Sequence, residues 1–432
     1  MTAEIVVMNS VAIALAADSA VTVQNPYIGE GNQKIYNTSN KLFMLSKFDP
    51  VGIMIYGNAD LLRVPWEVII KMYRNNLAAK SFPTVKEYAL DFISYLEAFF
   101  PEVEQVGHFF DNIAGFYYNI LLQEINTKVD ETIKENSKIE HQNVRKIVET
   151  TIKSHLEKLY ERPKLPSLPD DFDQSVIQKY QPQIEQAIND VFEKLPISKV
   201  GIERLINIAG CIFSRDVFPP NISGVVMAGF GKNETFPALF AIAVDGVING
   251  KLKYRVDHDT SIDPDRNAII IPFAQREMVN TFIEGIDPSF NQLLDGYLAK
   301  VFESYPRALI NNLSQSTEKE KQALLRTLSH ESTGILKKLR EDLKEYKEQV
   351  HINPILSAVG ILPKDELAAM AESLVNLTSF KRRVSMEAET VGGPIDVAVI
   401  SKGDGFVWIK RKHYFAPELN HHFFVNYFRD CL

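Results

Sequence analysis

The hydrophobic and polar positions of the first sixty residues predict a buried sheet. Two β-favouring apolar runs, at residues 1–7 and 13–17, flank a short polar step at Asn9-Ser10, which supplies turn residues where a hairpin needs them. Asp18 interrupts the second run with the alternation still in phase, so a carboxylate is expected at the end of a buried strand. Because a buried carboxylate needs a partner, the end of this strand is the first candidate for chemistry.

After residue 60 the hydrophobic period becomes that of helices. Residues 61–74 and 84–99 each have an apolar stripe at helical spacing, and Pro65 either bends the first helix or marks its first turn. Lys-, Glu- and Gln-rich helical sequence then extends over residues 102–198 and 282–350. An apolar stripe near the end of the second segment is more often core packing than a partner site.

Further β-type runs alternate with these helices. Residues 224–230 and 238–246 indicate two strands, the second ending in an Asp245-Gly246 turn. A strand at 267–275, a helix around 365–377 and strands at 395–400 and 406–409 follow. The organisation expected is a core of residues 1–100, 200–276 and 355–415, helical insertions at 101–199 and 277–354, and a C-terminal tail at 416–432.

Composition and charge narrow the function classes. The chain has 432 residues, 45% of them hydrophobic, and a net charge of −8 without a strongly basic segment, which argues against nucleic acid as the main partner. Cys211 and Cys431 are far apart in sequence, so neither a disulfide framework nor a zinc site is indicated. No apolar run is long enough to span a membrane. We therefore expect a cytoplasmic protein with no membrane partner.

Thr2 is the most interesting partner for Asp18, because removal of Met1 would make it the N-terminal residue. Its hydroxyl is a poor nucleophile alone, but its own α-amine, with a reference pKa of about 7.7 to 8.0, could accept the hydroxyl proton. A nearby lysine would depress the pKa of that amine and stabilise developing negative charge, while an aspartate would orient the lysine. This chemistry needs Thr, Asp and Lys together.

The same residues resemble a known family. Thr2 followed by Ala16-Ala17-Asp18-Ser19-Ala20-Val21-Thr22, by 40–45 (NKLFML) and by 51–60 (VGIMIYGNAD) is similar to the start of proteasome β-type subunits and their bacterial ring-protease relatives, which are N-terminal nucleophile (Ntn) hydrolases. The resemblance covers a little over half of the chain. It implies a four-layer αββα sandwich within the α+β class, a peptide or protein substrate and a homo-oligomeric ring.

The resemblance also implies roles for individual residues. Asp18 matches the catalytic aspartate, and Ala20 and Thr22 match substrate-binding positions. Two lysines compete for one role: Lys34 stands at the linear offset of the family lysine, whereas Lys41 stands at the head of the strand before the glycine turn. Lys41 is preferred, because the turn-rich residues 25–32 indicate a lengthened loop.

The oxyanion hole of this family is formed by a backbone N–H at a Gly-Gly pair, where this chain has Tyr56 and Gly57. A backbone donor does not depend on the side chain, so the role could survive, although an ordinary strand-to-helix turn capped by Asn58 is the plainer interpretation. Gln275 could supply a supporting hydrogen bond, and Glu387 or Glu389 could replace a supporting aspartate that this chain lacks.

Two functions are consistent with this pattern. The main hypothesis is a threonine hydrolase of peptide or other amide bonds, with Thr2, Asp18 and Lys41 as its reacting group. The alternative is a non-catalytic proteasome-like scaffold or regulatory protein, because Phe273 and Val391 stand where the family has serines. No cofactor is expected. The acidic residues and histidine at 257–265 fit no familiar metal loop, so no metal site is expected either.

Overall fold

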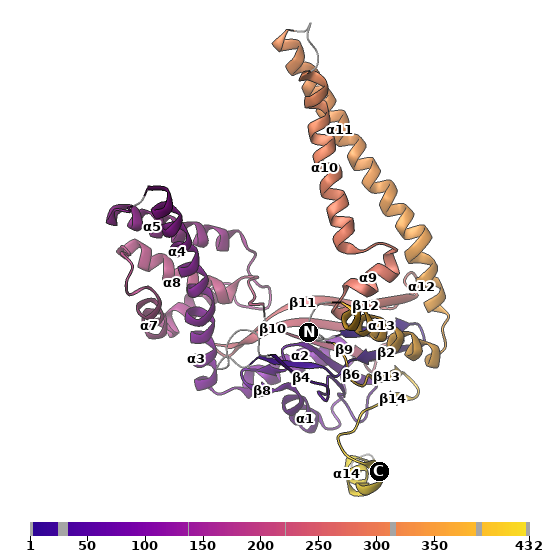
Figure 1. The fold of residues 1–432 in the computed structure, drawn as a ribbon. Coiled ribbons are helices and arrows are strands. Elements are labelled where there is room, and N and C mark those ends of the chain that lie inside the picture. Colours follow the sequence, from indigo (N-terminus) through magenta and orange to yellow (C-terminus); the bar gives the residue numbers. More distant parts are fainter. Residues whose placement is uncertain are drawn as a thin grey trace. The chain divides into compact units, whose positions relative to one another are not determined.

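The protein is α+β and forms two compact units. The computed structural model describes residues 3–24, 33–136, 138–220, 222–311, 317–385 and 391–428. The first unit consists of Met1–Leu42 and Ile262–Asp430, and the second contains Phe43–Ser261. Each unit holds one five-stranded sheet (Figure 1).

The sheet of the first unit contains the predicted N-terminal hairpin. All its neighbouring strands are antiparallel, in the order β12 (Ala268–Ala274), β1 (Ala3–Asn9), β2 (Ala12–Ala17), β13 (Asp396–Ser401) and β14 (Gly405–Lys410). Every residue of β1 and β2 is buried. Partners from residues 268–274 and 396–401 therefore flank a hairpin formed by residues 3–17.

Helix α13 (Lys364–Val384) packs on β1, β2 and β13. The β2 residues beneath it are small, Ala12, Ala14 and Ala16, so the helix can lie close to the sheet. Acidic residues in its first turn and basic residues in its last turn complement the helix dipole. The other helical segments of this unit are α9 (Glu277–Glu284), α10 (Pro288–Asn311), α11 (Glu318–Lys347), the π-helical η2 (Glu348–Ile352), α12 (Asn353–Gly360), the short η3 (Pro417–Leu419) and α14 (His421–Phe428).

The second unit has a sheet in the order β11 (Lys251–Ser261), β10 (Ala238–Ile248), β9 (Ser223–Gly229), β6 (Val51–Gly57) and β5 (Leu42–Met44). The predicted Asp245-Gly246 turn is wrong, because β10 continues through these residues with a register irregularity. The chain turns at Asn249 and Gly250, both with positive φ. Asn-Gly is as strong a hairpin signal as Asp-Gly, and the sequence analysis missed it.

Two helices pack with this sheet in one hydrophobic core, α1 (Trp66–Leu77) and α2 (Val85–Phe99). Helix α1 begins after Pro65 rather than at residue 61, because β7 (Asp60–Leu61) and β8 (Val64–Pro65) form a small hairpin before it. Thr84 caps α2 by accepting the Glu87 N–H. Pro65 therefore marks the helix start, which was one of the two alternatives.

The helical sequence after residue 100 forms a body with its own hydrophobic core. Aromatic side chains stack at its centre, where the Phe109 ring lies between those of Tyr180 and Phe213. Its elements are α3 (Glu102–Phe110), the π-helical η1 (Asp111–Tyr117), α4 (Tyr118–Asn136), α5 (His141–Glu161), α6 (Phe172–Lys179), α7 (Gln181–Phe192) and α8 (Lys199–Ser214). The predicted helical character of residues 102–198 is confirmed.

Candidate functional site

Asp18 lies at the end of β2, fully buried, and backbone groups hold its carboxylate. Its Oδ1 accepts the Ala3 N–H at 3.0 Å, and its Oδ2 accepts the N–H groups of Gly392 at 3.0 Å and Ala20 at 3.2 Å. These donors come from the start of β1, the segment before β13 and the residues after β2. The fold therefore creates a carboxylate site where three chain segments meet, and its hydrogen bonds compensate for burial.

Lys41 completes the site. Its Nζ lies 2.5 Å from Asp18 Oδ1 and 3.7 Å from Glu4 Oε1, and the side chain is almost fully buried. Glu4 comes from β1, where it is paired with Ala17 of β2. The expected contact between Asp18 and Lys41 is present. Such a buried pair holds its ammonium in place firmly, because either charge alone would be costly in this environment.

A second ion pair adjoins the first. Asp396, the first residue of β13, accepts the backbone N–H of Lys412 at 2.9 Å and also pairs with the Lys412 ammonium. Burial lowers the pKa of Lys412 below its ordinary value against the opposing effect of Asp396, and the positive charge of Lys41 lowers it further. The charges of the two pairs therefore interact, and together they form one cluster.

A cavity of about 340 Å³ shares Lys412 with this cluster. Its lining includes the backbone turn at Gly393 and Pro394 and the side chains of Lys410 and Arg411. Gly393 has a φ of +76°, and a Cβ there would lie 2.8 Å from that of Asn37, so glycine is required at this turn. The cavity gives a small group access to the edge of an otherwise buried cluster.

Several expected site residues are not described. Thr2 and Glu389 lie outside the described residues, as does Glu387, the alternative to Glu389. The backbones of Thr22 and Lys34 belong to the two-stranded pair β3 (Val21–Gln24) and β4 (Gln33–Tyr36), but their side chains are outside the description. The roles expected for these residues stay predictions.

Other expected residues have definite places. Ala20 is buried and donates its N–H to Asp18. Gln275 accepts hydrogen bonds from the Arg382 guanidinium, which positions it toward α13. Phe273 and Val391, which stand where the resembled family has serines, are both completely buried, Val391 in the hydrophobic core of the first unit and Phe273 in β12.

Tyr56 and Gly57 end β6 in the second unit. The Tyr56 hydroxyl donates to Asp257 Oδ2 at 3.2 Å. Gly57 has a φ of +79°, and a Cβ there would lie 2.2 Å from the carbonyl oxygen of Ile222, so only glycine fits. The oxyanion role expected for this backbone stays a prediction.

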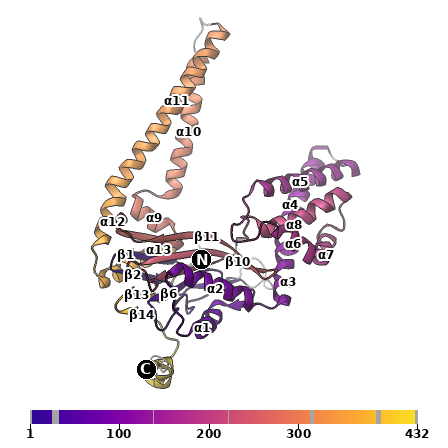
Figure 2. The same cartoon turned by 180° about the vertical axis from the view of Figure 1, so that it is seen from behind.

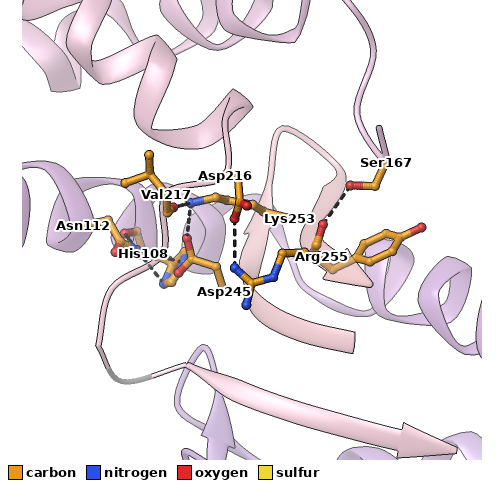
Figure 3. A network of polar contacts seen from close by, with 9 residues as sticks. His108, Asn112, Ser167, Asp216, Val217, Asp245, Lys253 and Arg255 are labelled. Carbon is orange, nitrogen blue, oxygen red and sulfur yellow. Dashed lines mark hydrogen bonds and ion pairs between the residues drawn. The ribbon is translucent and has the colours of Figure 1, made fainter. Parts of the chain in front are cut away.

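A polar network in the second unit was missed by the sequence analysis. Lys253 points at two acceptors, Asp245 Oδ2 at 2.8 Å and the Val217 carbonyl at 2.5 Å, and His108 Nε2 lies 3.6 Å from Asp245 Oδ1 (Figure 3). Asn112 is 3.0 Å from the same imidazole nitrogen. Asp245 interrupts the apolar run of β10, so a charge within a buried strand was the available signal, whereas Lys253 is one of several charged residues in β11 and is not singled out by the sequence.

This network borders a cavity of about 710 Å³. Burial by itself would raise the pKa of Asp245, but the charges of Lys253 and His108 more than offset this effect, and the pKa lies below its ordinary value. Ser223 also lines the cavity, where its hydroxyl accepts the Trp66 indole N–H at 2.8 Å. The buried Asp245–Lys253 pair is satisfied internally, which favours a structural role over a reacting group.

The described part of the chain contains no group of three or more His, Cys, Asp or Glu side chains arranged to hold a metal ion. None of the helices described there combines the length and apolar character that crossing a membrane requires.

Comparison with known proteins assigns neither a family nor a function to the chain. No protein-family model matches the chain, and no curated protein matches it in sequence.

Proposed function

We propose that this protein is an N-terminal threonine hydrolase of the proteasome-like Ntn type. The observation that supports the proposal is the buried Asp18–Lys41 pair, whose carboxylate accepts the N–H of Ala3. Thr2 is bonded to Ala3, and consecutive Cα atoms are about 3.8 Å apart, so the covalent chain itself keeps the N-terminal residue near this pair.

The proposed reaction is acyl transfer. The Thr2 hydroxyl oxygen attacks the amide carbonyl carbon, and its proton passes to the free α-amine. The Lys41 ammonium stabilises the developing negative charge, while Asp18 orients this ammonium. The protonated amine then gives its proton to the leaving nitrogen. Water hydrolyses the resulting ester and restores Thr2.

The fold proposal is the four-layer αββα sandwich of this superfamily. It is supported by two five-stranded sheets, each packed with helices, and by the complete burial of β1 and β2. With this assignment we also propose a peptide or protein substrate, a homo-oligomeric ring and a cytoplasmic location.

A second candidate function is a non-catalytic proteasome-like scaffold or regulatory protein. Two observations favour it. Phe273 and Val391 stand at positions where the family has serines, so neither position supplies a hydroxyl. Both side chains are also completely buried, as expected of core residues. In this alternative the Asp18–Lys41 pair has only a structural role, which is to stabilise the packing of the end of β2 against the start of β1.

The state of the N-terminus tests the enzyme proposal first. We expect the intact mass of the purified protein to lack Met1, because a small second residue permits its removal and the mechanism requires a free Thr2 amine. Thr2→Ser should keep measurable hydrolysis of a peptide substrate, whereas Thr2→Ala should have none. A protein that retains Met1 on essentially all molecules would overturn the enzyme proposal and leave the scaffold.

A further inference from the structure

The cavity of about 710 Å³ in the second unit lies at one end of its sheet. Helix α3 contacts β10 there, and the two elements lie side by side in both views (Figures 1 and 2). The walls come from the turn after β6, the β7–β8 hairpin, α3, η1, the segment before β9, and β10. Ligand sites are typically clefts of about 300–1,000 Å³. The cavity therefore has the volume of a site for a small organic molecule.

Two parts of the wall adopt backbone conformations that most sequences avoid. Leu62 and Arg63, at the turn between β7 and β8, have φ values of +46° and +65°, although neither is a glycine. Residues 111–117 form the π-helix η1, which also lines the cavity. Left-handed residues and π-helical turns are locally unfavourable and are concentrated at functional sites. The fold therefore maintains this wall against local preference.

The His108 imidazole is held in place where the cavity meets β10. A Cβ at Gly246 would lie 2.1 Å from His108 Nε2, so the imidazole can take this position only beside a glycine. Asp245 Oδ1 lies 3.6 Å from the same nitrogen, and Lys253 neutralises Asp245 (Figure 3). This side of the cavity is therefore formed before any ligand binds, which lowers the cost of binding.

Asn112 provides a buried acceptor in the cavity. The residue is only 8% exposed, and its Nδ2 donates to the backbone carbonyl of His108 at 3.2 Å. Within the part of the chain that the structure describes, no donor bonds the Asn112 Oδ1. An amide oxygen this deeply buried needs a donor. A ligand with an N–H group can supply one.

Two of the four carboxylates that line the cavity are neutralised. Lys253 pairs with Asp245 at 2.8 Å, and Arg63 pairs with Asp111 at 2.9 Å. The second pair joins the β7–β8 turn to the start of η1, and its side chains are 81% and 61% exposed. An exposed pair contributes little to stability, so it can rearrange when a ligand enters.

The other two carboxylates, those of Asp60 and Glu104, have no cationic partner among the described residues. Asn58 Nδ2 lies 3.4 Å from Asp60 Oδ1, and no described lysine, arginine or histidine forms an ion pair with either acid. Four carboxylates against two cations leave two negative charges, or one if His108 is protonated. The walls of a cleft focus such a charge and attract a ligand of the opposite sign.

These groups define the chemistry of a ligand. The two carboxylates and the amide oxygen are all acceptors, so a ligand needs several N–H donors and a positive charge. An amidinium or guanidinium group provides both, whereas a carboxylate or phosphate would meet charges of its own sign. Apolar contacts are available from Leu62, Phe116, Pro219 and Pro220.

We propose that this cavity binds a small organic cation. The acceptors of Asp60, Glu104 and Asn112 bind its amidinium or guanidinium group, and its apolar part contacts Leu62 and Phe116. The proposal concerns binding and does not depend on hydrolase activity.

Three probes of nearly the same shape test the requirement for positive charge. Benzamidine is a cation, benzamide is neutral and benzoate is an anion. In a saturation-transfer NMR titration of the full chain, we expect a Kd on the order of 1 mM for benzamidine, as for other ligands of about nine non-hydrogen atoms. Benzamide should bind at least about tenfold more weakly, and benzoate more weakly still. Benzamidine that binds no better than either analogue would overturn the proposal.

Substitutions test whether benzamidine occupies this cavity. Asp60→Asn with Glu104→Gln should weaken its binding at least about tenfold, because both uncompensated charges are lost. Glu131→Gln, at an exposed position of α4 outside the cavity, is the matched control and should leave binding unchanged. All three changes preserve side-chain size, so circular dichroism should stay native. Unchanged binding in the double variant would contradict the proposal.

Two further variants test the sign of the charge and the location of the ligand. Glu104→Lys should weaken benzamidine binding more than Glu104→Gln, because a like charge then replaces the carboxylate. Equal binding by these two variants would show that charge at this position is irrelevant and would overturn the site. Thr2→Ala should bind benzamidine as wild type does, whether or not the protein hydrolyses peptides. Loss of binding in Thr2→Ala would place the ligand at the proposed hydrolase centre instead.

Discussion

At the scale of single residues, the candidate site is a set of charges held where strand ends meet. The sequence predicts the partnership of Asp18 with Lys41, because Asp18 stands at the expected spacing from Thr2 and Lys41 stands at the head of the strand before the glycine turn. It did not predict Glu4, Asp396 or Lys412. Asp396 and Lys412 are almost four hundred residues from Asp18, and only the pairing of β13 with β2 brings them to this site.

Lys41→Met should abolish hydrolysis and destabilise the fold by about 3–5 kcal/mol, because it leaves the buried Asp18 and Glu4 without their cation. Lys34→Met is the matched control and should keep most of the activity. Steady-state kinetics and urea unfolding measure the two effects. Full activity in Lys41→Met, with loss in Lys34→Met, would show that the other lysine has the catalytic role.

The Asp245–Lys253 pair should make the stability of the protein depend on pH. The pKa of Asp245 is lower in the folded than in the unfolded state, so the pair stabilises the protein above about pH 3.9, and this stabilisation is lost as the pH falls toward the folded-state pKa. Lys253→Met should cost about 3–5 kcal/mol at pH 7. In urea unfolding, the difference in unfolding free energy between wild type and Lys253→Met should become smaller below about pH 4. A difference that is constant from pH 7 to pH 3 would contradict this account.

At the scale of elements, local patterns predict much of the structure. The β1–β2 hairpin, α2 and the helical character of residues 102–198 follow from apolar periodicity and turn residues. The errors arise where two local signals compete. Residues 61–65 have helical spacing but form β7 and β8, and Asp245-Gly246 has turn chemistry but lies within a strand whose true turn is Asn249-Gly250.

Asn9 is predicted to be a stabilising residue of the N-terminal hairpin rather than an ordinary turn residue. Its Oδ1 accepts the N–H groups of Val11 and Ala12, and its Nδ2 donates to the carbonyls of Val359 and Leu362. Asn9→Ala should therefore cost about 2–4 kcal/mol in urea unfolding, because several buried partners lose their bonds. The exposed Asn143→Ala, in α5, should change stability by less than about 0.5 kcal/mol. Equal effects of both substitutions would show that these hydrogen bonds contribute little.

At the scale of the whole molecule, the sequence predicts the α+β class but not the pairing of its strands. Each sheet joins segments that are far apart in the chain: β12 pairs with β1, and β6 pairs with β9. Apolar alternation identifies a strand but contains no information about a distant neighbour, so the position of Asp396 beside β2 could not be predicted.

Labelling of Thr2 by a peptide epoxyketone tests the central claim most directly. An activated N-terminal threonine supplies both a hydroxyl and a free amine to this electrophile, so we predict one adduct per chain, located on Thr2 by tandem mass spectrometry. The adduct should be lost in Thr2→Ala and strongly reduced in Asp18→Asn, with Asp91→Asn in α2 as the control. A protein that has lost Met1 and remains folded, yet forms no adduct at Thr2 with a range of such peptides, would contradict the claim.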